Sequence, residues 1–113
     1  MAIQLKEYLD GTGHSPFTSW FRCLNSQAAT KVVTVLYRLK QGNFSNVEGV
    51  GAGVFEYKLN FGPGYRIYFG KDGEHLVILV GGGTKQQQSK DIKLAKQRWQ
   101  DYKIRKRHSG LSL

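Results

Sequence analysis

In the first third of the chain, apolar residues recur three or four positions apart, which predicts two helices. Ser15 precedes a proline, so a capping hydroxyl and a proline suited to the first helical turn mark the start of a short helix. Asn25 or Ser26 can cap a second helix, whose apolar stripe ends near Gly42. The connection is short, so an antiparallel helix pair is expected. Looser alternation before Asp10 predicts a short N-terminal strand.

From Val54 the period of the apolar positions changes to two, which is typical of strands. The alternation resumes after the turn at 62–64, so these two segments form a hairpin. A tight turn at Asp72 then leads into the apolar run 75–80, a third strand suited to burial on both faces. The segment 42–53 contains four glycines and no sustained period, and it is predicted to be a loop within one domain.

After the glycine run 81–83, apolar residues at helical spacing predict a last helix that begins at Thr84 or Ser89. A basic stripe lies beside the apolar one, so one face should dock on the sheet and its neighbour should stay basic. The segment 103–113 is expected to be a mobile basic tail. The candidate nucleic-acid contacts on this helix and tail are Lys93, Lys96, Lys103, Arg105, Lys106 and Arg107.

Together these elements predict one α+β domain over residues 1–113. Two N-terminal helices pack on an antiparallel sheet, formed by the short N-terminal strand and a three-strand meander, and a C-terminal helix follows. The chain carries 17 Lys and Arg against 8 Asp and Glu, a net charge of +9. Nine of the basic residues and only two acidic ones lie in 84–113, so an anionic partner is expected, either nucleic acid or an acidic protein.

Several classes of protein are excluded by the same sequence. The longest purely apolar run, 76–80, is far shorter than the roughly 20 residues of a membrane span, and the N-terminus lacks a signal-peptide pattern. We therefore expect a cytoplasmic protein without a membrane partner. The single Cys23 cannot form an intrachain disulfide, and its thiol is expected to be buried. The three histidines share no ligand spacing, and no dinucleotide or Walker motif is complete, so neither a metal nor a cofactor is predicted.

Alternation along the hairpin separates two faces of the sheet. The face with Glu56, Lys58, Arg66 and Tyr68 suits an RNA phosphodiester, because cations stabilise charge on phosphate while a tyrosine or lysine moves a proton or packs on a base. An ordinary solvated face with a cross-strand Glu–Lys pair explains the same pattern. The glycine run 81–83 likewise suits either a phosphate-binding turn or a flexible connection. The side chains expected on the core face are Phe55, Tyr57, Leu59, Tyr65, Ile67 and Phe69.

Three segments of the chain and several residues after them form a recognisable combined pattern: 53–59, 61–69 and 79–85, together with Gln88, Asp91, Ile92, Ala95 and Trp99. With this pattern the chain resembles, over essentially its whole length, the RelE/ParE toxin superfamily, and within it the HigB-like addiction module killer branch. This resemblance implies the toxin of a bacterial or phage type II toxin–antitoxin pair, with two helices packed on an antiparallel sheet and a terminal helix nearby.

The resemblance also implies a metal-independent endoribonuclease that cuts messenger RNA on the ribosome, where the ribose 2′-OH attacks the adjacent phosphate. Arg66 is then expected to stabilise the phosphate, Lys58 to position it or abstract a proton, and Lys85 to make a second phosphate contact. The general acid stays unassigned. The other expected catalytic residues are Glu56, which would orient the cations, and Tyr68 and Tyr102, which would stack on a base or supply a proton.

The partners that the resemblance implies are the ribosome, messenger RNA and a cognate antitoxin with a helix-turn-helix domain. The ParE branch shares the fold but inhibits DNA gyrase, so a non-nucleolytic inhibitor is the alternative, and a basic nucleic-acid-binding accessory protein is a third. The nuclease hypothesis requires the cations to converge outside the hydrophobic interior. Cations that are splayed apart, or an Arg66 locked inside that interior, would remove its basis.

Overall fold

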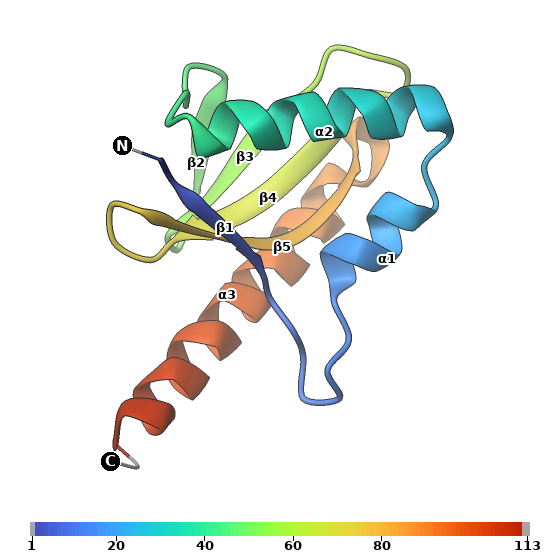
Figure 1. The fold of residues 1–113 in the computed structure, drawn as a ribbon. Coiled ribbons are helices and arrows are strands. Elements are labelled where there is room, and N and C mark those ends of the chain that lie inside the picture. The colour runs from blue at the N-terminus through green and yellow to red at the C-terminus, as the bar shows by residue number, and fades with distance from the viewer. Residues whose placement is uncertain (1, 112–113) are drawn as a thin grey trace.

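The computed structural model describes residues 2–111 and shows an α+β protein with a five-stranded mixed sheet and three α-helices. Helices α1 and α2 lie on one face of the sheet and α3 lies on the other, extending beyond the sheet edge (Figure 1). In the part of the chain described, no helix is both long and apolar enough to cross a membrane. The elements are β1 (Gln4–Glu7), α1 (Pro16–Arg22), α2 (Ser26–Lys40), β2 (Val47–Gly51), β3 (Val54–Lys58), β4 (Tyr65–Lys71), β5 (Leu76–Thr84), the 3-10 helix η1 (Lys85–Gln87) and α3 (Gln88–Leu111).

The strand order is β1-β5-β4-β3-β2. Strands β2 to β5 form an antiparallel meander, but β1 pairs with β5 in parallel, with Gln4 opposite Leu76. The prediction of a purely antiparallel sheet is therefore wrong at this edge. The reason is topological, because the α1–α2 excursion returns the chain to the far side of the sheet and only the later meander brings β5 alongside β1.

The prediction that 42–53 is only a loop is also wrong, because this segment contains β2. Val47 pairs with Tyr57 of β3, and the two strands are joined by a turn at Ala52 and Gly53, which have φ of 55° and 81°. Positive φ at both positions is the geometry of a tight hairpin turn. The glycines and a register shift between Gly49 and Gly51 interrupt the apolar alternation, and this interruption hides the strand.

The helix starts follow the predicted caps. Ser15 Oγ accepts the Thr18 backbone N–H at 3.1 Å, and Asn25 Oδ1 accepts the Ala28 N–H at 2.8 Å. The expected antiparallel pair of α1 and α2 is not formed, because α1 packs on β5 through Trp20 while α2 crosses the sheet separately (Figure 1). Cys23, expected to be buried, is exposed at the end of α1.

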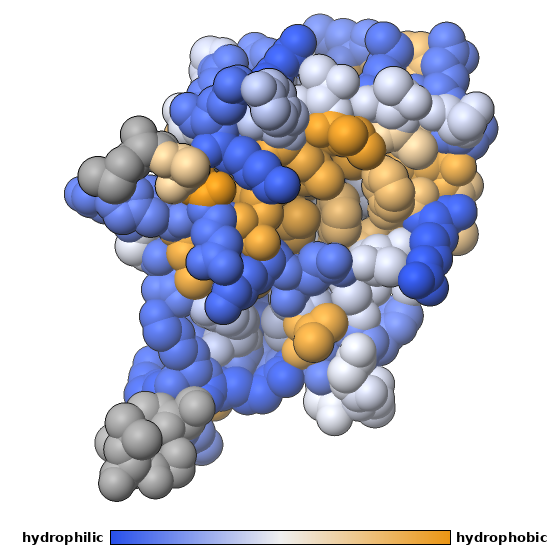
Figure 2. Space-filling model, viewed as in Figure 1, coloured by the Kyte–Doolittle hydropathy of each residue, from blue (hydrophilic) through white to orange (hydrophobic). Residues whose placement is uncertain are grey.

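Two separate cores form, one on each face of the sheet. The α1–α2 face buries the side chains predicted for it, with Phe55 and Tyr65 partly exposed at its margin. A shallow apolar hollow remains between α2 and β1, with a volume of about 420 Å³, and it appears as the orange area between blue rims in Figure 2. On the opposite face, the apolar residues buried between the sheet and α3 are Tyr8, Val54, Tyr68, Ile78, Val80, Ala95 and Trp99.

Candidate site at the ends of β3 and β4

The strand register brings the predicted cations together. Lys58 is directly opposite Arg66 across the β3–β4 pair, and Arg66 is opposite Gly83 of β5. Lys85 follows in η1. If Gly64 carried a Cβ atom, that atom would lie 3.2 Å from the Cβ of Lys85 and 3.0 Å from Nη1 of Arg66. Gly64 has φ of +76°, so a residue without a side chain permits this approach. The register thus places Lys58 beside Arg66, with Lys85 nearby at Gly64, and their joint action on one phosphate stays a prediction.

Arg66 is far less accessible than expected. The residue is only 7% exposed, Nη1 donates to the Gly64 carbonyl at 2.7 Å, and Nε lies 4.0 Å from Glu56 Oε2. Among the described residues, Nε has no hydrogen-bond partner. Arg66 belongs to neither apolar core, yet it is enclosed, so the prediction of a solvent-facing cation at this position is wrong.

The neighbouring Glu56 is 1% exposed and accepts two hydrogen bonds from Gln88 Nε2, at 3.1 and 2.9 Å. Gln88 is the first residue of α3, and sequence reasoning gave it no chemical role. Its importance follows from the packing of α3 on this face. Two features of the sequence were available signals for that packing. One is the apolar stripe on the last helix, and the other is the set of apolar residues of β3 and β5 that point away from the first core.

Tyr68, opposite Glu56 in the register, is also buried under α3. Its hydroxyl has no hydrogen-bond partner among the described residues. Burial raises the pKa of this hydroxyl well above its ordinary value, and the nearby Glu56 carboxylate raises it further. The expected solvated polar face is therefore a covered one, because α3 lies over it.

Two of the three cations remain accessible. The Lys58 side chain is 40% exposed and its Nζ lies 3.4 Å from Glu48 Oε2 on the adjacent edge strand. Lys85 is exposed at the start of η1. The site is thus an enclosed arginine and carboxylate flanked by two surface lysines.

The glycine run forms neither a phosphate-binding turn nor a flexible connection, since Gly81 to Gly83 lie within β5. Each glycine allows a larger side chain to lie directly on the strand. Trp20 lies against Gly82 from the α1 face, and Asp91 lies against Gly83 from the α3 face. Arg98 lies over Gly81 and donates to the Val80 carbonyl at 2.9 Å, beside an irregularity in the β4–β5 register. The run serves close packing between the sheet and two helices.

Tyr102 lies away from this site. Its hydroxyl donates to Asp72 Oδ2 at 2.7 Å, and Asp72 follows the end of β4 opposite to Arg66. Burial and this carboxylate raise the pKa of Tyr102 to about 12. The sequence-based grouping of Tyr102 with the catalytic residues is therefore not reproduced by the structure.

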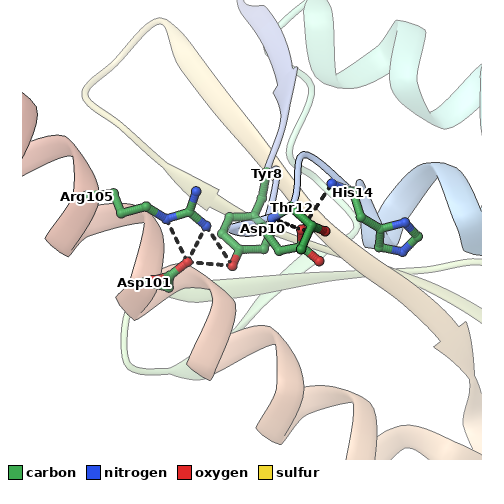
Figure 3. Close-up of polar contacts among 6 residues, drawn as sticks. All are labelled: Tyr8, Asp10, Thr12, His14, Asp101 and Arg105. Atoms are coloured by element: carbon green, nitrogen blue, oxygen red, sulfur yellow. Dashed lines mark hydrogen bonds and ion pairs between the residues drawn. The ribbon is translucent and has the colours of Figure 1, made fainter.

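The C-terminal half of α3 is tied to the sheet by polar contacts (Figure 3). Tyr8 donates to Asp101 Oδ2 at 2.6 Å, while Arg105 donates to Tyr8 at 3.0 Å and pairs with Asp101. Lys106 forms an ion pair with Asp72 at 2.6 Å. Arg105 and Lys106, both predicted RNA contacts, thus have intramolecular partners.

The other predicted basic contacts differ in exposure. Lys93, Lys103 and Arg107 are exposed and form no ion pair within the described part of the chain, whereas Lys96 is half-buried near Gly51. The structure continues α3 through the predicted tail as far as Leu111, and residues 112–113 lie outside the described range. Mobility of this segment in solution stays a prediction.

A cleft of about 590 Å³ opens between α2 and the β2–β3 hairpin and shares Lys58 with the cation cluster. Tyr57, almost fully buried, points its hydroxyl toward Arg38 Nη1 at 3.4 Å and Asn46 Nδ2 at 3.3 Å. Sequence reasoning did not identify this cleft, because its walls come from α2 and from the unpredicted strand β2. The lining residues are Lys31, Thr34, Val35, Arg38, Ser45, Asn46, Val47, Glu48, Tyr57, Lys58, Leu59, Asn60 and Phe61.

The fold and the site define an α+β protein with a partly enclosed cationic centre at the end of its sheet. No protein-family model matches the chain. A protein of Haemophilus influenzae, described only as an uncharacterized protein, is 41% identical over 97 residues, which cover 85% of this chain and 92% of that protein. The chain belongs to the same family as this protein.

Proposed function

We propose that this protein is the toxin of a type II toxin–antitoxin module of the RelE/ParE superfamily, in its HigB-like branch, and that it cleaves messenger RNA on the ribosome. The sequence resemblance described above supports the class. The α+β architecture, with helices on both sheet faces, is compatible with the fold that the resemblance implies.

One observation carries the nuclease proposal: Arg66 is opposite Lys58 in the sheet and near Lys85 at Gly64, and its Nε, 4.0 Å from Glu56 Oε2, has no hydrogen-bond partner among the described residues. A buried donor left without an acceptor costs about 1–3 kcal/mol, and native structures rarely keep one without a reason. A phosphate oxygen is an acceptor that would satisfy this donor. A purely structural arginine would have its donors paired within the protein.

The chemistry assigned to the site is attack of a ribose 2′-OH on the adjacent phosphorus, with the bond to the 5′-oxygen breaking. Arg66 and Lys85 stabilise the charge that develops on the phosphate oxygens, and Lys58 positions the phosphate or takes the 2′-OH proton. Tyr68 is covered by α3, and burial raises the pKa of its hydroxyl, so it holds its proton more tightly than an ordinary tyrosine and does not act as a base at neutral pH. Glu56, clamped by Gln88, holds the arginine in place.

Enclosure of Arg66 is the observation that weighs against this function. Contact with RNA requires the structure around Arg66 to open, because the residue is only 7% exposed. The same enclosure favours a second candidate, a non-nucleolytic inhibitor that binds gyrase or another protein, in which Arg66 is structural. The exposed Lys93, Lys103 and Arg107 suit an anionic partner in either case, as does an acidic antitoxin.

Induced expression of matched variants separates these candidates. Lys85→Ala changes an exposed residue and should reduce transcript cleavage about tenfold or more, because a phosphate contact is lost. Arg66→Ala should abolish cleavage and toxicity in a chain that circular dichroism shows to be folded, and Arg22→Ala, exposed on α1, should behave as wild type. Mapping of RNA 5′ ends after induction is the measurement.

Growth arrest by the wild type without new RNA 5′ ends, and with a DNA-damage response, would instead support the gyrase-type inhibitor. Loss of the effect on truncation of 103–113, with no effect of Arg66→Ala, would support the accessory nucleic-acid-binding role.

A further inference from the structure

The cleft between α2 and the β2–β3 hairpin has the size and the charge of a binding site. Its volume of about 590 Å³ falls within the range of small-ligand pockets, about 300–1,000 Å³. Three of its lining residues are cations, Lys31, Arg38 and Lys58, and one is an anion, Glu48. Glu48 pairs with Lys58, so the cationic charge of Lys31 and Arg38 on the α2 wall is not balanced within the cleft.

The floor of the cleft offers hydrogen-bonding groups to a polar ligand. Tyr57 Oη accepts weak hydrogen bonds from Arg38 and Asn46, which leaves the tyrosine proton available to a further acceptor. At the other end, Lys31 Nζ lies over the Phe61 ring, 4.7 Å from its centroid. A ring and a cation side by side suit one base and one phosphate of a single strand.

The position of the cleft connects it to the cation cluster. Lys58 lines the cleft and is also directly opposite Arg66 in the sheet. Lys58 is the last residue of β3, whereas Tyr57 and Leu59 of the cleft point to the opposite face of the sheet from Arg66. A chain with one phosphate at Lys58 would therefore pass around this end of the strand to reach Arg38. We propose that this cleft binds the segment of single-stranded RNA next to the link held at Lys58, Arg66 and Lys85, with Arg38 and Lys31 contacting its phosphates. This inference rests on the proposed action on RNA and adds a binding subsite to it.

The test is binding of a fluorescein-labelled octamer of 2′-O-methyl RNA, measured by fluorescence anisotropy at several salt concentrations. This probe lacks the 2′-OH nucleophile and is not cleaved, so its binding is read independently of catalysis. The double variant Lys31→Ala/Arg38→Ala should bind about tenfold more weakly at 0.15 M salt, because two phosphate contacts are lost, and the salt dependence should become shallower. The control Lys6→Ala/Arg22→Ala removes the same charge from exposed positions outside the cleft and should change binding less than twofold.

A second variant tests the space rather than the charge. Thr34→Trp places a large ring in the cleft from the exposed side of α2 and should weaken RNA binding to a similar degree. Equal affinity of the Lys31/Arg38 variant and its control would overturn the inference, as would wild-type protein that does not bind the octamer. Binding of an oligoglutamate peptide, but not RNA, with the same dependence on Arg38 would also overturn it and assign the cleft to an acidic protein partner.

The outcome is separable from that of the proposed nuclease function. Cleavage that is lost in Lys85→Ala but unchanged, in rate and position, in the Lys31/Arg38 variant would leave the nuclease standing and remove the subsite. Octamer binding that depends on Arg38 in a protein that never cleaves RNA would keep the subsite and remove the nuclease.

Discussion

The two faces of the sheet bury different kinds of side chain. The α1–α2 face is an apolar core, and the hydroxyl of its Tyr57 has two hydrogen-bond donors beside it. The α3 face buries Glu56 and Arg66 and leaves Arg66 Nε and the Tyr68 hydroxyl without partners. Burying polar groups in this way costs stability unless they are hydrogen-bonded. The comparison indicates that the first face mainly stabilises the fold, whereas the second carries a local cost in stability, for which the proposed function supplies a chemical reason.

The largest expected effect comes from the apolar face. Leu39, fully buried on α2, should lose about 2–5 kcal/mol of unfolding free energy on change to alanine, because a cavity replaces packed methyl groups. Urea unfolding measures this loss. Val33, 53% exposed on the same helix, provides the control, and Val33→Ala should lose less than about 1 kcal/mol. Similar losses in the two variants would contradict the assignment of the core.

On the α3 face, Glu56→Ala should lower the unfolding free energy by about 1–3 kcal/mol, since the Gln88 amide loses its hydrogen-bond acceptor and the buried Arg66 loses its ion-pair partner. Thermal unfolding followed by circular dichroism is suitable. The exposed Glu48→Ala is the matched control and should change little. If the two variants were equally stable, Glu56 would not be the anchor of the buried cluster.

A third pair of variants removes one hydroxyl from each face. Tyr57→Phe should cost about 0.5–1.5 kcal/mol, because two donors lose their acceptor, whereas Tyr68→Phe should be neutral or slightly stabilising, because its hydroxyl has no partner. Urea unfolding of both variants under one condition gives the comparison. An equal loss in Tyr68→Phe would show that its hydroxyl is hydrogen-bonded after all, and the contrast between the faces would disappear.

The smallest effect concerns the polar contacts at the C-terminal half of α3. Hydrogen bonds from Lys106 and Tyr102 lower the pKa of Asp72 below its ordinary value near 3.8. A lowered carboxyl pKa stabilises the folded state above that value, and the stabilisation is lost as the pH falls through the folded pKa. Asp72→Asn should therefore cost less than about 1 kcal/mol at pH 7, and the difference from wild type should shrink below about pH 4.

Asp91, which lies on α3 against Gly83, should change stability with pH in the opposite direction. Burial raises its pKa, so its ionised form is disfavoured in the folded state at neutral pH. Asp91→Asn should increase stability at pH 7, and the gain should disappear below about pH 4, where both states of the wild type are protonated. Urea unfolding at pH 7 and pH 3.5 checks both aspartates. A difference of the same sign in the two variants would contradict the placement of these carboxylates.

Elements with strong local signals were predicted well. The caps at Ser15 and Asn25 and the alternation from Val54 to Phe69 depend on near neighbours, so they can be seen in a short window of sequence. Strand β2 was missed because its glycines carry no apolar side chains, and its place is defined by the partner strand β3. The parallel pairing of β1 with β5 joins residues more than 70 positions apart, for which no local signal exists.

The candidate site shows the same division. Alternation in the sequence was sufficient to place Lys58 and Arg66 on one face, because successive strand residues point to opposite sides. The roles of Gln88 and the cleft beside Arg38 were not visible, because they arise where α3 and α2 meet strands distant in sequence.

Sequence alone thus determined the helices, the strands with regular apolar alternation and which of their side chains share a sheet face, because these depend on the periods of the backbone. Only the tertiary structure decided whether that second face is open or covered. The covering helix α3 buries Glu56, Tyr68 and Arg66 because its own apolar stripe, with Ala95 and Trp99, has to be removed from water. Side-chain accessibility is a property of what packs on a residue, and that partner lies elsewhere in the chain.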